Sequence, residues 1–435
     1  MKRTIALVIT TLIFTLLIIV FKGFFSKQYI KLDEDKLAYK VFQKGLKNAV
    51  DFAIDRQGDY YIAYKDKIQY IDLKGKSYNI FLDKDLDINS LEYNDKKLYY
   101  ASHNKVFSYD LQSKKQELII NDLPNYGDYK ESKLKIYKDE LYITIGTATN
   151  SGVVGSDNEW LKDNPFYFDL SPKDITLRGS SFGSERTGAF VPYKTKNTKG
   201  QLIPGHFPGN GTIVTYNLKT KTLESFAWGI RNVKGLDFNS EGKLFASIGG
   251  MENRGLRPIE GDVDYIYEIK KNIWYGWPDY SGGDPVTSPR FRGGNKSKTQ
   301  FLLDNHPNSN PPAPIYQHNS IDSLAALAVD SKGEIENKDC IYLYDKRDNT
   351  LYAFNKGNSV KRISKFDDNT NISSIRIFNN SLILLDIKGG VIYHIYKPNN
   401  SLATLDKSLM YYLLFTIIIL IMIIIWKFNF TTKKQ

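Results

Sequence analysis

Short apolar runs separated by polar turns recur along most of the chain. The unit FAIDRQGDYYIAY begins at Phe52, and its apolar residues alternate with polar ones on both sides of a turn. Comparable units begin at later positions, namely Leu91, Leu134, Leu236, Leu327 and Ile375. Period-two alternation around turns rich in Gly, Asn and Asp is typical of β-hairpins. The pattern therefore predicts a series of hairpins rather than helices.

A third strand follows several of these hairpins. Segments such as KIQYIDLKGK in the first unit and GVIYHIYKPN in the last one again end in a polar turn. The early units start about 40 residues apart, which is the length of one propeller blade. The sequence therefore predicts an all-β chain folded as a six-bladed β-propeller.

Two units are longer than the others. The spacing roughly doubles after Leu134 and after Leu236, so these intervals must hold extra strands and long loops. The largest insertion, residues 151–210, shows no helical period, but it contains aromatic residues such as Trp160, Phe166, Tyr167, Phe168 and Phe190. Disordered segments are poor in such residues. We therefore expect an ordered loop on the rim of the propeller.

Two apolar segments lie outside the repeats. Residues 5–21 and 409–426 carry no charge, and each is close to the ~20 residues that span a bilayer. The first could be a cleaved signal peptide, but no small-x-small cleavage site follows it, which favours a retained anchor. Lys427, Lys433 and Lys434 follow the second span and predict a cytoplasmic C-terminus. We expect a cell-membrane protein with a central extracytoplasmic domain and both termini in the cytoplasm.

These features divide the chain into consecutive parts. They are an N-terminal membrane anchor (1–28), the propeller (29–398), a linker (399–408), a transmembrane helix (409–426) and a cytoplasmic tail (427–435).

The composition narrows the range of partners. The formal net charge is +11, but the lysines alternate with Asp and Glu and form no basic stripe, so we expect no nucleic-acid partner. A basic exterior facing an anionic membrane or cell-wall polymer is the simpler interpretation. The single cysteine, Cys340, excludes an internal disulfide, and its apolar surroundings predict a buried residue.

One stretch holds candidate site residues. GIRNVKGL runs from Gly229 to Leu236, and Arg and Asn are unusual directly before a strand. A Gly249-Gly250 step, acidic residues and WYGWP at residues 274–278 follow in order. This series resembles the pyrroloquinoline-quinone (PQQ)-dependent sugar dehydrogenases, the glucose/sorbosone dehydrogenase family of six-bladed propellers. The resemblance covers roughly Leu123 to Pro278, and the outer blades share only the blade pattern.

The resemblance implies a PQQ cofactor at one end of the central channel. Arg231 and Asn232 would then hold the quinone, because a buried anion needs cationic and amide partners. Lys346, in YDKRDN, falls where the family has a cofactor-binding lysine. The residues alone leave other roles open. Asn232 could cap the turn, Arg231 could pair with a neighbouring blade, and Lys346 could be an exposed turn lysine.

The resemblance also implies a calcium ion, held partly by backbone carbonyl groups. The corresponding step here is Gly250-Met251, and carbonyl oxygen suits a hard cation. Asp262 and Asp264 lie two residues apart on one face of a strand, which suits either an ion or a strand-end turn. Their spacing matches no strict calcium loop.

The sequence departs from the family at the catalytic base. The family uses a histidine shortly after a Leu-Pro, and imidazole suits that role because its pKa lies near neutrality. Here Leu123-Pro124 is followed by Asp128 and then Tyr129, a poor base at neutral pH. His206, in the long insertion, is an alternative base. The family's arginine pair at the last blade is replaced by Asn371 and Ser373.

Three classes of function therefore remain. The first is a membrane-anchored sugar dehydrogenase that oxidises the anomeric carbon, an activity that Tyr129 places in question. The second is a non-catalytic extracellular propeller that binds carbohydrate or a cell-wall polymer. The third is a membrane-anchored interaction scaffold. The sequence does not decide whether the chain is an enzyme.

Overall fold

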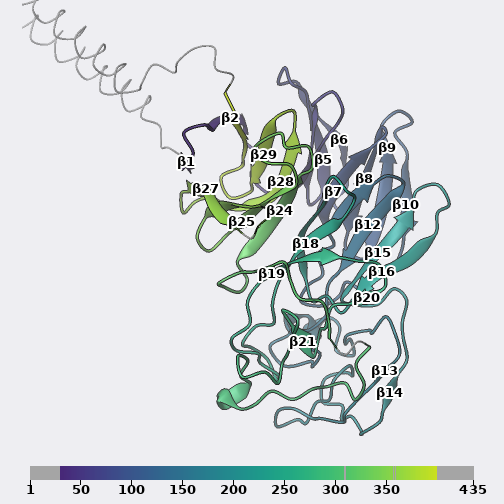
Figure 1. Cartoon of the computed structure of the whole chain (residues 1–435). Helices are drawn as coiled ribbons and strands as arrows, with labels where there is room; N and C mark the ends of the chain where they lie inside the picture. The colour runs from purple at the N-terminus through teal and green to yellow at the C-terminus, as the bar shows by residue number, and fades with distance from the viewer. Residues whose placement is uncertain (1–29, 308–309, 356, 358, 399–435) are drawn as a thin grey trace, which may run out of the picture. The chain divides into compact units, whose positions relative to one another are not determined.

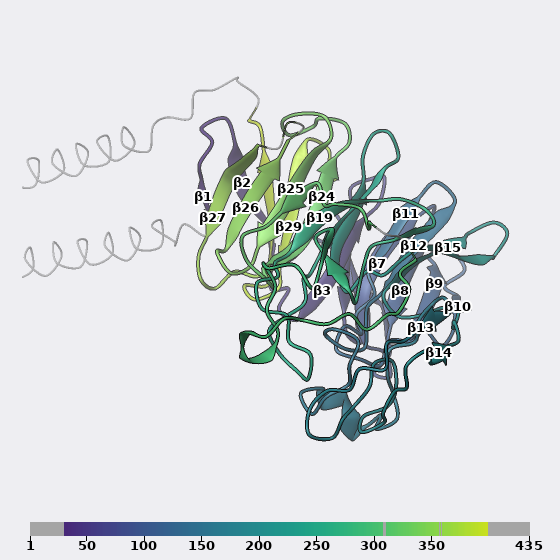
Figure 2. The ribbon, with the colours of Figure 1, turned by 60° about the horizontal axis from the view of Figure 1, so that its bottom comes forward.

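The computed structural model describes residues 30–398, apart from residues 308–309, 356 and 358. Within this part, six sheets of four or five strands follow one another around a ring (Figures 1 and 2). The first strand of each sheet contacts the first strand of the next sheet, and the sixth contacts the first. The prediction of a six-bladed, all-β propeller is therefore confirmed. The helices in the described part are two short 3-10 turns, η1 (Glu159–Lys162) and η2 (Gly294–Lys296).

The first three blades follow the chain in order. Blade 1 consists of β3 (Ala49–Ile54), β4 (Tyr60–Tyr64), β5 (Lys67–Ile71) and β6 (Ser77–Leu82). Blade 2 consists of β7 (Ile88–Asn94), β8 (Lys97–Ser102), β9 (Lys105–Asp110) and β10 (Gln116–Ile120). Blade 3 consists of β11 (Leu134–Tyr137), β12 (Glu140–Ile145), β15 (Thr212–Asn217), β16 (Leu223–Trp228) and β20 (Ile273–Trp274).

The last three blades include the N-terminal strands. Blade 4 consists of β17 (Val233–Phe238), β18 (Leu244–Ile248), β19 (Tyr265–Ile269) and β23 (Tyr316–Gln317). Blade 5 consists of β24 (Leu324–Asp330), β25 (Cys340–Asp345), β26 (Thr350–Phe354), β27 (Val360–Phe366) and β1 (Ile30–Leu32). Blade 6 consists of β28 (Ile372–Phe378), β29 (Ser381–Asp386), β30 (Val391–Tyr396) and β2 (Ala38–Lys44).

The repeated turns explain why each hairpin forms where the sequence predicts it. In the β17–β18 hairpin, Asn239 Oδ1 accepts hydrogen bonds from the backbone N–H of Glu241 (3.0 Å) and of Lys243 (2.8 Å). Gly242 adopts φ = 78°, a conformation that a side chain would strain. The side chain at the first turn position thus folds the backbone, and glycine completes the reversal.

The ring closes through its two ends. β2, near the start of the described part, pairs antiparallel with β30, near its end, from Ala38 opposite Tyr396 to Lys44 opposite Val391. β1 pairs with β27 and extends blade 5. Blade 6 is therefore built from both ends of the ring's sequence.

Apolar side chains fill the space between neighbouring blades. A separate buried cluster lies between each of the six adjacent pairs of blades. Between blades 1 and 6, for example, Phe52 and Ile62 pack with Ile383 and Leu385, all of them buried. Cys340 is buried in the cluster between blades 5 and 6, as the sequence predicts.

Long connections from blades 3 and 4 form what we call the insertion lobe: residues 151–210, 249–264 and 270–315. Two short ribbons occur in it, β13 (Ile175–Thr176) with β14 (Leu202–Ile203), and β21 (Tyr280–Ser281) with β22 (Asp284–Pro285). The loops that carry β13 and β14 lie together at the bottom of both views (Figures 1 and 2). The lobe has an apolar cluster of its own that includes Phe190 and Trp274, whereas Phe166 is 81% exposed.

The predicted membrane spans, residues 5–21 and 409–426, lie outside the described residues. Among the residues that are described, no helix has the length and apolar character needed to cross a bilayer.

Candidate functional site

The candidate residues come from connections at one face of the ring. Strands alternate in direction within a blade, so the connection from its second to third strand emerges on the same face as the link to the next blade. Tyr129 and Arg231 lie on links between blades, and Glu252 and Lys346 lie on second-to-third connections. Side chains far apart in sequence are thus brought to a common surface.

Arg231 is 4% exposed, and its guanidinium is surrounded by acceptors. Nη2 donates to Asn150 Oδ1 (2.8 Å), to Glu252 Oε1 (2.7 Å) and to the Tyr129 hydroxyl. Nε donates to the Asn150 carbonyl at 3.1 Å. The guanidinium also lies over the Tyr129 ring, 4.2 Å from its centroid. These contacts hold Arg231 within the protein and not toward open solvent.

A second arginine extends this network. Arg254 donates to Glu252 Oε2 (2.6 Å), to Asp128 Oδ2 (2.6 Å) and to the Tyr129 hydroxyl (2.9 Å). The Tyr129 hydroxyl in turn donates to Glu252 Oε1 at 3.0 Å. We call Asp128, Tyr129, Arg231, Glu252 and Arg254 the arginine cluster. Two guanidinium groups and two carboxylates here enclose one phenol.

Residues 157–160 of the insertion lobe add further contacts to the cluster. Asp157 accepts a hydrogen bond from Arg254 Nη1 at 2.7 Å. Asp128 Oδ1 accepts from Trp160 Nε1 at 2.8 Å, and the Asn158 amide donates to both Asp128 oxygens (3.1 and 3.0 Å). Both carboxylate oxygens of Asp128 are therefore engaged in structural contacts.

The protonation states follow from burial and charge. Burial raises the pKa of Tyr129 above its ordinary value, so the phenol stays protonated at neutral pH. Burial alone would also raise the pKa of Glu252, but the charges and hydrogen bonds of Arg231 and Arg254 outweigh it and hold that pKa at about 2. The cluster thus contains an ionised glutamate and a neutral tyrosine.

Asn232 and Lys346 occupy neighbouring parts of this face. Asn232 is buried, and its carbonyl accepts the Gly249 N–H at 2.9 Å. Lys346 Nζ lies 2.8 Å from Asp322 Oδ1, and Lys234 Nζ lies 3.8 Å from the same oxygen. Burial lowers the pKa of Lys234; Asp322 opposes this shift, and the charges of Lys346 and Arg231 add to it. Lys234 was not predicted as a site residue, although it lies two positions after Asn232.

The residues predicted to bind calcium mainly organise backbone. Asp262 accepts the Met251 N–H at 2.6 Å and the Tyr265 hydroxyl at 2.6 Å. Asp264 accepts the N–H groups of Gly250 (3.2 Å) and of Ser323 (2.7 Å). No group of three or more His, Cys, Asp and Glu side chains suited to a metal ion occurs in the described part of the chain.

These contacts test whether an anionic quinone would fit. Its carboxylates need cations with free donors. Arg231 is committed to Glu252 and Asn150, and Lys346 is paired with Asp322. The resemblance implies an arginine at the position where Ser373 stands. As arranged here, the residues do not fit the cofactor that the resemblance implies.

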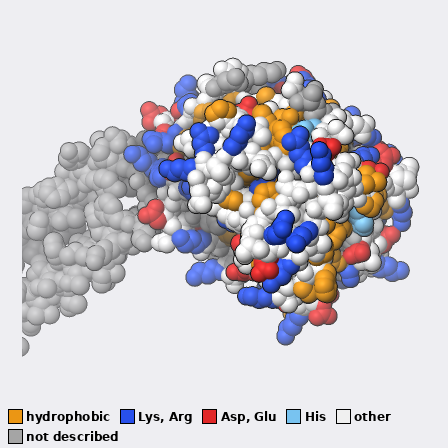
Figure 3. Space-filling view, turned by 90° about the horizontal axis from the view of Figure 1, so that it is seen from below, with side chains coloured by type: hydrophobic (Ala, Val, Ile, Leu, Met, Phe, Trp, Pro, Cys, Tyr) orange, Lys and Arg blue, Asp and Glu red, His pale blue; other side chains and the backbone are white. Residues whose placement is uncertain are grey.

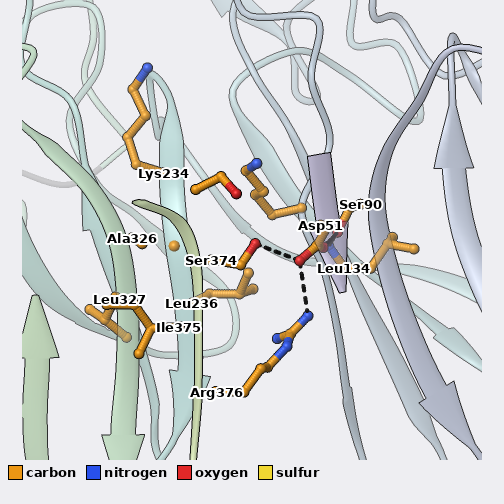
Figure 4. A pocket seen from close by; sticks show the side chains of 13 residues that line it. Asp51, Ser90, Leu134, Lys234, Leu236, Ala326, Leu327, Ser374, Ile375 and Arg376 are labelled. Atoms are coloured by element: carbon orange, nitrogen blue, oxygen red, sulfur yellow. Dashed lines mark hydrogen bonds and ion pairs between the residues drawn. The ribbon is translucent and has the colours of Figure 1, made fainter. Parts of the chain in front are cut away.

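The central channel holds a small pocket. Its walls come from the first strands of the blades, and its free volume is about 30 Å³. Asp51 accepts a hydrogen bond from Ser374 at 2.5 Å and faces Arg376 at 3.5 Å (Figure 4). Lys234 projects from another wall in the same view. This pocket is too small for a sugar or a quinone, so the space for such a ligand lies elsewhere.

That space is a groove of about 940 Å³ on the same face as the arginine cluster. Asp128 and Arg254 lie at its edge, and the loop that carries Trp160 forms one wall. The charged side chains along it are mixed in sign: Lys65, Asp87, Asp128, Lys130, Glu131, Lys133, Asp157, Glu159, Lys162, Asp163 and Arg254. Carboxamides and aromatic rings also line it: Asn89, Asn104, Asn125, Asn164, Tyr126 and Trp160.

Three polar atoms in the groove lack partners. Asn89 Oδ1, Asn125 Oδ1 and Ser373 Oγ have no hydrogen-bond partner among the described residues. Asn125 is only 6% exposed, and its amide nitrogen is fixed by Ser132 Oγ at 2.8 Å. A buried polar atom without a partner is costly, and water or a ligand usually satisfies it. The groove is therefore lined by polar residues whose hydrogen-bonding capacity is not used up within the described part of the protein.

The histidines do not supply a base near Tyr129. His206, the predicted alternative, is exposed, and its ring bonds the Pro208 carbonyl at 2.8 Å. His306 bonds Asp279 (3.0 Å) and His318 bonds Asp345 (2.9 Å). Only His103 lines the groove among the described histidines, and its ring lies 3.2 Å from the Asp85 carbonyl.

Comparison with known proteins agrees with the fold. No protein-family model and no curated protein matches the sequence. Among solved structures, the chain is similar to a calcium structure of a family AA12 carbohydrate-active enzyme from Trichoderma reesei, at 13% identity and a TM-score of 0.59, over 86% of this chain and 98% of that one. It is similar to the holo PQQ domain of pyranose dehydrogenase from Coprinopsis cinerea, at 10% identity and 0.57, over 85% and 98%.

The chain also resembles PQQ-bound aldose sugar dehydrogenase from Streptomyces coelicolor, at 15% identity and a TM-score of 0.51, over 83% of this chain and 99% of that one. At such identities the likeness shows a shared fold alone. The fold of this chain is thus that of the PQQ-dependent sugar dehydrogenase propellers.

Proposed function

We propose that this chain is a membrane-anchored, extracytoplasmic propeller that binds a neutral carbohydrate in its groove without oxidising it. The observation that carries the proposal is the state of Tyr129. A general base must accept a proton at the working pH. The Tyr129 hydroxyl is instead bonded to Glu252 and Arg254, and partial burial raises the pKa of the phenol.

The groove supports a neutral polyol as ligand. Its six carboxylates and five cationic side chains balance closely, so neither a strongly anionic nor a strongly cationic ligand is favoured. Asn89, Asn125 and Ser373 line it with polar side chains whose hydrogen-bonding capacity is not used up, and Trp160 and Tyr126 line it with aromatic rings. Sugar hydroxyl groups donate and accept hydrogen bonds, and a few well-placed polar groups among aromatic rings can orient such a ligand.

The location is proposed from the sequence. The apolar residues 5–21 and 409–426 would anchor both ends, and Lys427, Lys433 and Lys434 would keep the C-terminus in the cytoplasm. A cell-wall carbohydrate would then be accessible to the groove. Protease added to intact cells should degrade the propeller and spare the termini; a protected propeller would contradict this placement.

A quinone-dependent sugar dehydrogenase is the second candidate. The fold shared with PQQ-bound and calcium-bound solved structures favours it. PQQ would then lie against Arg231, Asn232 and Lys346, and calcium at the Gly250-Met251 carbonyl groups, after the ion pairs there had rearranged. When bound, the quinone would supply the hydride acceptor; this chain lacks a histidine to remove the sugar proton.

Calorimetry of the full-length chain separates the two candidates. One arm uses PQQ with and without calcium, and the other uses neutral oligosaccharides and cell-wall polysaccharide. We expect binding only in the second arm, weakened several-fold by Asn125→Ala and unchanged by Asn272→Ala, a positive-φ turn residue outside the groove. Quinone binding with sugar oxidation that Tyr129→His accelerates would overturn the proposal.

A further inference from the structure

The insertion lobe contains a second hollow that the groove does not explain. It measures about 590 Å³ and shares no lining residue with the groove. Its walls come from two parts of the lobe, the β13–β14 connection and the segment after β22. They carry Arg178, Ser180, Lys199, Thr287, Lys298, Thr299, Gln300, Phe301 and Asp304.

Cations dominate this hollow. Arg178, Lys199 and Lys298 face a single carboxylate, Asp304. None of the three forms an ion pair with another residue in the described ranges. Arg178 instead lies over the Phe301 ring, 5.7 Å from its centroid, which fixes the guanidinium beside an aromatic wall. Lys and Arg side chains are also conspicuous on the face that the lobe presents in Figure 3.

Hydroxyl groups accompany the cations. Ser180, Thr287 and Thr299 line the hollow with them. Thr299 is 5% exposed, and its Oγ1 has no hydrogen-bond partner among the described residues. A buried hydroxyl without a partner is costly unless a bound group satisfies it. The Thr299 hydroxyl is shielded from solvent, so it supports the site less directly than the three cations do.

We propose that this hollow binds the phosphate group of a phosphate ester. Three cations and three hydroxyls supply several donors, which matches an oxyanion with several acceptor oxygens and up to two negative charges. The volume greatly exceeds that of phosphate alone, and Phe301 offers an apolar wall for the organic part. The site is separate from the groove, so it stands whether or not the groove binds carbohydrate.

The test uses calorimetry of the full-length chain at low ionic strength with glycerol 3-phosphate, inorganic phosphate and glycerol. Glycerol 3-phosphate should bind more tightly than inorganic phosphate, glycerol should not bind, and added salt should weaken the binding. Arg178→Gln or Lys298→Gln should lower the affinity about tenfold, because hydrogen bonds from charged donors are the strong ones. Thr299→Val should lower it several-fold.

Lys74→Gln is the matched control, because Lys74 is an exposed turn lysine of blade 1 and its loss changes the net charge equally. The Lys74→Gln variant should bind glycerol 3-phosphate with the same affinity as the unaltered chain. An equal loss in Lys74→Gln and Arg178→Gln would mean that only net charge matters, and would overturn the site. Equal binding of glycerol and glycerol 3-phosphate would overturn the site as well. Equal binding of inorganic phosphate and glycerol 3-phosphate would overturn the proposal that the ligand is an ester.

Discussion

Each blade of the ring packs against its neighbour through side chains that alternate along paired strands, whereas the insertion lobe has only two-residue ribbons of sheet. Its backbone groups form isolated bridges and single hydrogen bonds in place of long ladders, and buried side chains satisfy others. Arg257, 3% exposed, donates to the carbonyls of Ser151 (2.9 Å), Pro278 (3.0 Å) and Gln300 (2.8 Å), and to Asp279 (3.0 Å). The ring is thus specified by apolar periodicity and the lobe by individual polar residues.

The largest effect should come from breaking that polar centre. Arg257→Met leaves the fully buried Asp279 without its cation, which should cost about 3–5 kcal/mol of unfolding free energy. Limited proteolysis should then cut the lobe before the ring. Simultaneous loss of lobe and ring would show that the two regions unfold as one unit.

A ring substitution should behave differently. Ile62→Ala removes a fully buried side chain between blades 1 and 6 and should cost about 3 kcal/mol. Denaturant unfolding followed by tyrosine fluorescence should shift as a whole, because each blade supports the next. Selective cleavage of the lobe in the Ile62→Ala variant would contradict the distinction between a ring that unfolds as a whole and a lobe that unfolds first.

The pH dependence tests the cluster that joins the two regions. The pKa of Glu252 is about 2 in the folded chain, below its ordinary value of 4.5, so its stabilising contribution is present above pH 4.5 and lost as the pH falls toward 2. After a discount for partial exposure, that contribution is about 2 kcal/mol. Glu252→Gln should lower stability at neutral pH and flatten the decline between pH 4.5 and 2. An unchanged decline would place the acid sensitivity elsewhere.

A smaller effect is expected at the phenol. Tyr129→Phe keeps the ring under Arg231 but removes the hydroxyl that bonds Glu252 and Arg254, at a cost of about 1 kcal/mol. Thermal unfolding measures it. If Tyr129→Phe unfolds at a higher temperature than the unaltered chain, the hydroxyl destabilises the fold and serves a purpose other than stability.

The smallest effect belongs to the exposed rim of blade 3. Lys219 pairs with Asp139 at 2.7 Å, but more than half of each side chain is exposed. Lys219→Ala should change the free energy of unfolding by about 0.5 kcal/mol or less. A loss comparable to that of Glu252→Gln would mean that this ion pair is far less solvated than its exposure indicates.

The same contrast explains what the sequence could predict. Alternating residues around turns such as Asn239 to Gly242 specify hairpins locally, so the six predicted hairpins and the propeller are confirmed. Residues 151–210 carry no periodic signal, and their order depends on contacts with segments about a hundred residues away, such as Ser151 with Arg257. Such pairings cannot be inferred from one sequence.

The candidate site was predictable only in part. The GIRN stretch drew attention to Arg231, which the structure places in the cluster with Tyr129. Glu252 and Arg254, in GGMENRG, were not predicted, because two charged residues in a Gly-rich loop resemble an ordinary solvated turn. Arg231, which pairs with Glu252, lies 21 residues earlier in the chain. Asp128, which pairs with Arg254, lies 126 residues earlier. No sequence pattern distinguished Asn125 as a site residue.

The pairing of β2 with β30 has a consequence for synthesis on the ribosome. β2 is made among the first strands, yet its partner is among the last, separated by nearly the whole ring. Until β30 emerges, the growing chain presents open strand edges, which invite pairing with other chains. The ring can therefore complete itself only after translation has passed Tyr396, and a ribosome that stalls earlier leaves an arc of blades for the cell's chaperones to protect.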